Sequence, residues 1–326
     1  CENCGAKNMF TEPRMFNLML KTFLGPAEEQ ANVVYFRPET AQAMFVDFKQ
    51  VLDTTRKKLP FGIAQIGKAF RNEIAPGNFI FRTREFEQME IEYFIREAEW
   101  TQSFENWRRE MWDWMEHDLG LNKEHIHELE VPDGERAHYS KRTIDFEYDY
   151  PFGRKELYGL AYRTDFDLKN HFKEPPYKDV EAGEELYPHV IEPTWGVDRS
   201  VLAVLCDGYT QEKDRLVLKL KPRLAPYKAA VFPLLANKPK LVEKARGIYD
   251  GLHTRFMVAW DDRGNIGKRY YAQDEIGTPW GITIDFQTLE DDTVTVRDRD
   301  TMEQERMKVN ELAAYVNKKL HDETAL

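Results

Sequence analysis

The spacing of apolar side chains alternates between the two-residue period of strands and the 3.6-residue period of helices. A short apolar run at 33–36 predicts a buried strand. Apolar residues at helical spacing then predict a helix from about 38 to 55, whose first turn accommodates Pro38. Residues 62–72 and 84–95 predict two strands joined by a loop that contains a Pro-Gly pair. The chain therefore opens with mixed strands and helices.

The middle of the chain continues this mixture. A stripe of tryptophan and other large apolar side chains over 100–119 predicts a core-facing helix that stops at Gly120. The segment 143–168 contains strand-like runs, and the polar, proline-rich segment 172–187 predicts a loop. Apolar residues at helical spacing over 197–209 predict another helix.

The pattern changes near residue 222, where we place a boundary between a domain at 1–221 and a second domain at 222–326. In the second domain, four strand-like segments (KAAVFPLL, TRFMVAW, TPWGITIDF and TVTVRDR) are interspersed with helical patterns at 239–252, 267–276 and 308–320. Strands that alternate with helices predict a small α/β sheet domain.

The strand predicted at 84–95 carries its charges in a regular order. Gln88, Glu90 and Glu92 occupy even positions, while the odd positions from Met89 onward are apolar. Because side chains alternate across a strand, one face is apolar and the other carries carboxylates and an amide. Alternation alone favours a sheet with one solvated face and cross-strand ion pairs.

Two features favour a binding site over that simple interpretation. In the preceding strand, Arg71 shares a face with small residues that leave room above the sheet, and Arg82 and Arg84 follow in the connecting loop. Phe86 lies on the polar face, where solvent exposure would disfavour an aromatic ring. Arginines above a sheet with an aromatic ring nearby suit a nucleotide, with guanidinium on phosphate and ring on base.

Composition limits the class of protein. The 326 residues are 42% hydrophobic and 32% charged, which is typical of a globular protein, and the net charge of −11 argues against coating nucleic acid by bulk electrostatics. No apolar run reaches the length of a membrane span. Three cysteines favour a reducing, cytoplasmic compartment. For Cys1 and Cys4 we favour two free thiols over half a zinc site, and Cys206 is expected in the core.

Several ordered motifs resemble one enzyme family. FRNE at 70–73, followed by F-R-x-R-E-F-x-Q-x-E, resembles the second signature motif of class II aminoacyl-tRNA synthetases. FRPETAQAMFVDFKQV, GIAQIGKAFRNEI, YRTDFDL and VIEPTWGVDRSVLAVL narrow the resemblance to glycyl-tRNA synthetase of the dimeric type. LKLKPRLAPYKAAVFPL and DTVTVRDRDTMEQ resemble that family's anticodon-binding domain. The resemblance runs essentially from end to end.

The resemblance implies an α+β catalytic domain, built on an antiparallel sheet flanked by helices, followed by a small α/β anticodon-binding domain. It implies activation of glycine with ATP and Mg²⁺, transfer of the glycyl group to tRNA(Gly), and a homodimer. The first class II motif, which helps to form the dimer interface, is not found. Together with a first residue that is not methionine, this leads us to expect a chain without its N-terminal part.

The resemblance also assigns roles on the nucleotide side. It implies that Arg71 holds the α-phosphate, Arg199 the γ-phosphate and Arg82 the phosphate tail, and these are the expected catalytic residues. It implies that Phe86 stacks on adenine and that Glu156 is a candidate Mg²⁺ ligand. The ATP-binding set is completed by Asn72, Glu73, Phe81, Leu157 and Gly196.

On the amino-acid side, the substrate offers only an ammonium and a carboxylate, and an ammonium requires carboxylates. The resemblance implies a glycine pocket that contains Glu39, Phe86, Glu87, Gln88, Glu90, Arg163, Glu192, Thr194 and Gly196. An acid such as Glu39 in the first turn of a helix is also favourable for purely structural reasons. Discrimination is expected to be steric, because every competing amino acid is larger.

The chain departs from the family pattern at Ala43, where glycine is usual, and at Thr194 and Trp195, where the family has a serine motif. Two alternatives stay open from the sequence. One is a non-catalytic, synthetase-like protein that binds nucleic acid or has a regulatory role. The presence of Arg71, Arg82 and Arg199 disfavours this alternative. The other is a ligase that makes an adenylate for a different acceptor, which the second domain disfavours.

Overall fold

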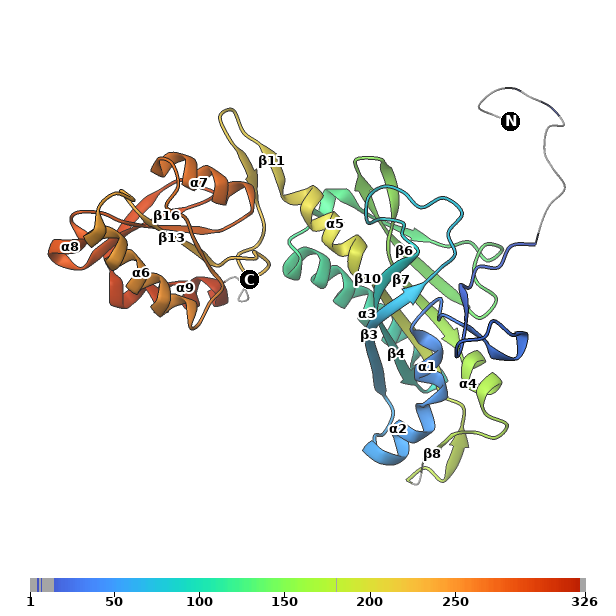
Figure 1. Ribbon diagram of the computed structural model, residues 1–326. Coiled ribbons are helices and arrows are strands. Elements are labelled where there is room, and N and C mark those ends of the chain that lie inside the picture. Colours follow the sequence, from blue (N-terminus) through green and yellow to red (C-terminus); the bar gives the residue numbers. More distant parts are fainter. Residues whose placement is uncertain (1–4, 6, 8–14, 180, 323–326) are drawn as a thin grey trace. The chain divides into compact units, whose positions relative to one another are not determined.

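The computed structural model describes residues 5, 7, 15–179 and 181–322 (Figure 1). Cys1 and Cys4, for which free thiols were favoured, lie outside the described residues. The chain forms two compact units, each discontinuous in sequence. The first contains Cys1–Trp100, Ala137–Lys141 and Ala161–Arg199, and the second contains Thr101–Arg136, Arg142–Leu160 and Ser200–Leu326.

A six-stranded sheet has the strand order β3-β4-β10-β7-β6-β5. The pairs β3–β4, β4–β10 and β5–β6 are antiparallel, as the sequence predicted. The strands are Phe61–Phe70 (β3), Glu85–Ile95 (β4), Ile126–Glu130 (β5), Arg142–Tyr150 (β6), Gly153–Thr164 (β7) and His189–Gly196 (β10). The two long strands predicted at 62–72 and 84–95 thus form within a few residues of their expected bounds.

The helix predicted from 38 to 55 forms as two shorter ones, α1 (Ala41–Val46) and α2 (Phe48–Thr55). Asp47 separates them with φ −85° and ψ −2°, angles that depart from the α-helix. Both helices bury phenylalanines against β3 and β4 in a cluster of Ala41, Phe45, Phe48, Phe61, Phe94, Leu168, Tyr177 and Val190. Pro38 lies before the first helical turn, so its placement inside the helix is corrected.

Two further expectations are corrected. The strand at Val33–Tyr35 (β2) forms, but Tyr35 and Phe36 are exposed because β2 pairs only with the short β1 (Lys21–Phe23). The segment 172–187 contains a hairpin of β8 (Tyr177–Asp179) and β9 (Glu184–Leu186). This hairpin is fixed by burial of Tyr177 and by ion pairs from Arg96 to Asp179 and Glu184.

The helices predicted around 100–119 and 197–209 are confirmed. The first is α3 (Trp100–Asp113), which continues through the π-helical turn Trp114–Asp118 and stops at Gly120, where φ is +73°. The second is α5 (Val197–Gly208), on which Cys206 is only partly buried. The segment predicted as strands at 143–168 ends in a helix, α4 (Phe166–His171). No helix in the described ranges combines the length and apolar character needed to cross a bilayer.

A five-stranded sheet lies near the C-terminal end of the chain, with strand order β14-β13-β15-β16-β17. Strand β13 is parallel to β14 and β15, and the remaining pairs are antiparallel. The strands are Ala229–Pro233 (β13), Val258–Trp260 (β14), Trp280–Ile284 (β15), Thr293–Asp298 (β16) and Gln304–Lys308 (β17). The predicted α/β sheet and the strands in its four apolar segments are confirmed, and β17 was not predicted.

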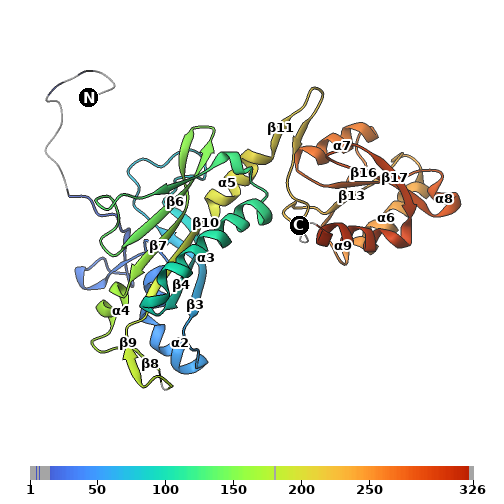
Figure 2. The ribbon, with the colours of Figure 1, turned by 180° about the vertical axis from the view of Figure 1, so that it is seen from behind.

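Helices cover both faces of this sheet. Alternate residues of β13 pack against α6 (Pro239–His253) and α9 (Leu312–Asp322) on one face, and against α7 (Ile266–Glu275) on the other. Both views show α6 beside α9 (Figures 1 and 2). Burial on both faces explains why the sequence of β13 is a continuous apolar run without alternation. The remaining helices are the short α8 (Thr288–Asp291) and the 3₁₀ turns Gln30–Asn32, Glu97–Glu99, Lys123–His125 and Val309–Glu311.

A buried carboxylate on α7 joins this sheet to the hairpin of β11 (Tyr209–Gln211) and β12 (Leu216–Leu218). Asp274 is 1% exposed and accepts hydrogen bonds from Arg215 at 2.7 Å and from Arg297 at 2.9 and 3.0 Å. The hairpin lies just before the boundary at 222, which stays a prediction. One carboxylate thus serves two buried guanidinium groups.

We predict that Asp274→Ala destabilises the chain by about 3–5 kcal/mol, because it leaves two guanidinium groups buried without their shared carboxylate. Urea unfolding of the variant measures this loss. Asp250→Ala, which removes an exposed carboxylate from α6, is the matched control and should change the unfolding free energy by less than about 0.5 kcal/mol. Equal stabilities of the two variants would contradict the structural role of Asp274.

Candidate active site

The polar face of β4 is its buried face. Gln88, Glu90 and Glu92 are 7%, 3% and 0% exposed, whereas Met89 and Ile91 on the other face are only partly buried. The alternation read from the sequence is confirmed, but a solvated polar face is wrong. Segments distant in sequence cover these carboxylates, so each needs a partner or must lose its charge.

Arg163 on β7 supplies the positive charge. Its Nε and Nη2 each donate to the Asp167 carboxylate at 2.8 Å, and its Nη1 donates to Glu192 on β10. The guanidinium carbon lies 3.8 Å from the ring centroid of Tyr139 and 5.3 Å from that of Phe45. With 1% of its surface exposed, Arg163 is held by charge-assisted hydrogen bonds and by stacking on aromatic rings.

Two hydroxyls satisfy the carboxylate of Glu90. Thr40, fully buried just before α1, donates to one oxygen, and Thr194 on β10 lies 3.1 Å from the other. The hydroxyl of Thr194 also lies 3.2 Å from Glu192 and therefore bridges the two carboxylates. The register places Thr194 directly opposite Glu90, which fixes this arrangement. Thr194 thus retains the hydroxyl of the serine usual in the family.

Glu92 differs from its neighbours. Among the described residues, neither of its carboxylate oxygens has a hydrogen-bond partner. Oxygen atoms of Glu90, Glu92 and Glu192 lie within 4.8 Å of one another, so a small cation entering between them would meet all three. At an effective dielectric constant of about 20, two like charges about 4 Å apart repel by roughly 4 kcal/mol. Three ionised carboxylates are therefore disfavoured in the absence of such a cation.

The pKa values follow from this environment. Burial, and after it the charge of Glu192, raises the pKa of Glu92 well above its usual range. Burial raises the pKa of Glu192 to about 8, against the opposing effect of Arg163. The pKa of Glu90 is also raised by burial, while the hydroxyls of Thr40 and Thr194 lower it. Desolvation is the first cause in each case.

Near the start of β4, arginines lie beside the exposed carboxylates of Glu85 and Glu87. The guanidinium carbon of Arg71 lies 5.3 Å from the ring centroid of Phe86, and its Nε donates to the carbonyl oxygen of Pro38 at 3.0 Å. Arg199 on α5 lies 4.3 Å from the ring centroid of Phe81 and donates to that residue's carbonyl at 3.4 Å. Two of the three predicted phosphate-binding arginines, Arg71 and Arg199, are thus paired with an aromatic ring that the sequence also assigned to the site.

The remaining predicted residues near the hairpin lie as follows. Arg82 is exposed in the loop, where its backbone pairs with Gly77. The side chain of Asn72 donates to the carbonyl of Asn17 at 3.2 Å, and Glu73 is half-buried beside Arg71. Gly196 is the last residue of β10, opposite Gln88, and it directly precedes α5.

Glu39 and Glu87, both predicted for the glycine pocket, differ in burial and in the face on which they lie. Glu39 is half-buried, accepts a hydrogen bond from Gln42 at 3.1 Å, and lies close enough to Glu90 for its charge to raise that residue's pKa. Glu87 is exposed at an odd position of β4, on the face opposite the carboxylate cluster. Its backbone N–H donates to the carboxylate of Asp198 at 2.8 Å. The structure therefore brings Glu39 to the site but not the side chain of Glu87.

Sequence reasoning missed several residues of this site. Arg37 crosses the sheet at Gly67, donating to the carbonyl of Lys68 at 2.6 Å and to Gln65 at 2.5 Å. A Cβ at Gly67 would lie 2.5 Å from this guanidinium, so the space above the small residues belongs to Arg37. Thr40 and Tyr139 were also missed, whereas Glu92 was placed on the polar face of the strand but given no role of its own. Arg163 lies near the end of β7 and Asp167 on α4, so no helical spacing in the sequence indicated their ion pair.

Glu156 and Leu157 belong to the second compact unit. Leu157 is buried in β7 and Glu156 is exposed. Burial, and then the charges of Glu156 and Glu147, raises the pKa of Asp145 to about 6. Oxygen donors on β6 and β7 thus form an acidic group, which is the chemistry that Mg²⁺ prefers.

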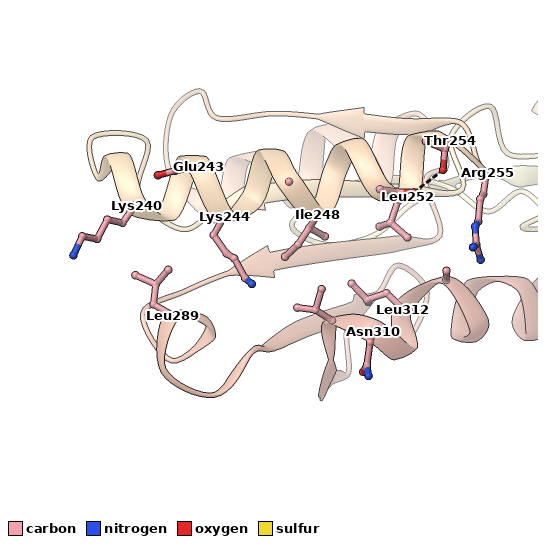
Figure 3. A pocket seen from close by; sticks show the side chains of 14 residues that line it. Lys240, Glu243, Lys244, Ile248, Leu252, Thr254, Arg255, Leu289, Asn310 and Leu312 are labelled. Carbon is pink, nitrogen blue, oxygen red and sulfur yellow. Dashed lines mark hydrogen bonds between the residues drawn. The ribbon is translucent and has the colours of Figure 1, made fainter.

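A separate groove of about 990 Å³ lies on the C-terminal sheet domain. Figure 3 shows α6 along one side and the segment around Asn310 and Leu312 along the other, with Lys240, Lys244 and Arg255 among the lining side chains. Lys244 forms an ion pair with Asp292. The groove has mixed apolar and basic walls and shares no residue with the carboxylate cluster.

Comparisons with known proteins cover nearly the whole chain. Residues 25–207 match the family model "tRNA synthetase class II core domain (G, H, P, S and T)", and residues 228–319 match "Anticodon binding domain". The chain is 52% identical to a glycine–tRNA ligase of Geobacillus thermodenitrificans, with 98% of this chain and 70% of the relative aligned. It is 49% identical to one of Streptomyces coelicolor (98% and 73%) and 48% identical to one of Thermus thermophilus (97% and 69%).

We predict that Glu92→Gln changes how stability depends on pH. The folded-state pKa of Glu92 is raised, so the folded chain binds one more proton than the unfolded chain above the ordinary pKa of 4.5. The wild type should therefore lose up to about 1.4 kcal/mol per pH unit relative to the variant as pH rises from about 5 to 8. Urea unfolding at pH 5, 6.5 and 8 measures the difference.

The matched control is Glu185→Gln, an exposed glutamate on β9 that pairs with Lys178. It should track the wild type at every pH. If Glu92→Gln were instead less stable than the wild type at pH 8, Glu92 would be ionised and stabilising in the folded chain.

Proposed function

The chain belongs to the glycine–tRNA ligase family of class II aminoacyl-tRNA synthetases, and we propose that the buried face of β4 is where it makes glycyl-adenylate. In the first step, the glycine carboxylate attacks the α-phosphorus of ATP and pyrophosphate leaves. In the second, a ribose hydroxyl of the terminal tRNA adenosine takes the glycyl group and AMP leaves. Both steps depend on positioning and on stabilising developing negative charge.

The carboxylate cluster is the proposed site of the glycine ammonium. Glu90 and Glu192 face the same space, and Thr194 bridges them. Glu39 adds negative charge near Glu90, while Arg163 orients Glu192. The cluster is closed to solvent, so each interaction with the ammonium is stronger than it would be in water. Glycine brings this cation with no side chain to accommodate.

Arg71 and Arg199 are the proposed phosphate ligands. Their guanidinium groups already lie against Phe86 and Phe81, which limits their freedom before substrate arrives. From Phe86 to Glu90 the strand advances by about 13 Å at 3.3 Å per residue. An adenylate lying along β4 would thus place its phosphate between the arginines and the carboxylates. Arg82, exposed in the loop, is available to contact the outer phosphates.

The family uses ATP with Mg²⁺, and we propose that Glu156 holds the ion. Its carboxylate belongs to the acidic group that includes Asp145, which fits a hard cation. When bound, Mg²⁺ would neutralise charge on the phosphates of ATP.

The C-terminal sheet domain is the proposed site of tRNA recognition. It matches an anticodon-binding family, and the groove with Lys240, Lys244 and Arg255 offers cations for a phosphate backbone. By similarity to the dimeric type, we also propose a homodimer. A role in translation would place the protein in the cytoplasm.

One observation supports this proposal above the others. A single strand joins arginine–aromatic pairs suited to a nucleotide with a buried carboxylate cluster suited to an ammonium. A non-catalytic relative would not need both the arginine–aromatic pairs and the buried carboxylate cluster. The match to an anticodon-binding domain also favours a tRNA acceptor over a different one.

We predict that Arg71→Ala leaves the chain folded and lowers glycine-dependent ATP–pyrophosphate exchange by at least about 100- to 1,000-fold, because the charge developing at the α-phosphate loses its partner. Exchange is measured with radiolabelled pyrophosphate. Arg109→Ala, which removes an exposed arginine from α3, should keep wild-type exchange. Near-normal exchange in Arg71→Ala would remove Arg71 from the mechanism.

We further predict that Thr194→Val raises the KM for glycine by about 10- to 100-fold, because two carboxylates lose a hydroxyl that hydrogen-bonds to both. Thr194→Ser retains the hydroxyl and should stay within a few-fold of the wild type. Initial exchange rates at varied glycine concentration give the KM for glycine of each variant. A Val variant with the KM of the wild type would show that the hydroxyl does not orient the pocket.

A further inference from the structure

Glu92 has the environment of a proton-carrying residue in the substrate pocket. Its side chain is fully buried, and among the described residues neither oxygen accepts a hydrogen bond. It is nevertheless within 4.8 Å of the carboxylate oxygens of Glu90 and Glu192. A buried carboxylate without a donor is costly when ionised.

Charged groups reach Glu92 from several elements. Glu192 on β10 and Glu90 on its own strand disfavour its ionisation, as does Asp167 on α4, while Arg163 on β7 favours it. From β3, the residue opposite Glu92 is the apolar Ile63.

From the side of α1, Glu39 adds further negative charge near Glu90 and Glu192. The environment of the empty pocket is therefore dominated by carboxylates, with one guanidinium to balance them.

The hydrogen bonds decide which carboxyl carries the excess proton. Glu90 accepts from Thr40 and Thr194, and Glu192 accepts from Arg163. Donors of this kind stabilise the ionised form of a carboxyl. Glu92 has none, so the proton is held most strongly there.

We propose that Glu92 is protonated while the pocket is empty and releases its proton to solvent when the glycine ammonium binds. This inference rests on the proposed glycine site. The ammonium replaces the missing counter-charge, so all three carboxylates can then be ionised. The proton goes to bulk water, and Glu92 completes the set of carboxylates around the cation.

The coupling has a defined consequence for affinity. Where the free pocket is protonated and the bound pocket is not, the apparent Kd for glycine falls by up to tenfold for each unit that pH rises. The glycine zwitterion keeps its charges between pH 6.5 and 8, so the dependence reports on the protein. Glu92→Gln lacks this proton but keeps Glu192, whose pKa is raised to about 8, so its Kd should fall less steeply with pH than that of the wild type.

Isothermal titration of the full chain with glycine tests this directly. Titrations at pH 7 in phosphate and in Tris, which differ in ionisation enthalpy, give the number of protons released on binding. We expect the wild type and Glu185→Gln to release about one proton more than Glu92→Gln, because Glu192, whose pKa burial raises to about 8, contributes to the release in all three. Kd values at pH 6.5, 7.25 and 8 provide the second readout.

Glycine binding without proton release in the wild type would overturn the inference and leave the proposed function standing. Undiminished release in Glu92→Gln would assign the proton to another carboxyl and would also overturn it. Absence of both glycine binding and glycine-dependent exchange in the wild type would overturn the inference and the proposed function together. A wild-type count of zero overturns the inference even if the variant does not fold.

Discussion

One buried guanidinium organises the carboxylate cluster of this site. Arg163 is 1% exposed and binds Asp167 through two nitrogens and Glu192 through the third. It therefore ties β7, α4 and β10 together at the point where the carboxylates of β4 gather. Its single positive charge cannot balance every acid around it. On the proposed assignment, this surplus of carboxylates attracts a cation, while Arg163 lowers the pKa values of Glu90, Glu92 and Glu192 against the effect of burial.

Strand alternation predicted correctly which side chains of β4 share a face, but it did not predict which face is buried. Apolar faces are normally the buried ones, so a polar face with Glu90 and Glu92 would be expected to face solvent. Here Thr40 and Arg163 cover that face from segments far away in sequence. Burial of a polar face depends on such distant partners, and local periodicity carries no information about them. The resemblance to a known family supplied what periodicity lacked.

The same difference between local periodicity and distant contacts applies to the rest of the fold. Long periodic segments such as α3, α5 and the C-terminal α/β sheet were predictable, because burial follows local spacing there. The break at Asp47 and the hairpin of β8 and β9 were not, since they depend on how phenylalanines pack and on ion pairs from Arg96. Gly67 suggested open space above the sheet, but the guanidinium of Arg37 lies there. Such close approaches are properties of the assembled chain.

Charge and exposure change together along β4. The end of β4 near Arg71 has exposed cations such as Arg82 and Arg84 beside the exposed Glu85 and Glu87, and the other end is closed over Glu92. A large, polyanionic substrate can thus approach the open end, where arginines placed on aromatic rings need little reorganisation. The closed end favours a ligand that brings one positive charge and the least volume. On the proposed assignment, selectivity for glycine arises from the burial that raises the pKa values of its carboxylates, because the same enclosure excludes water and larger side chains.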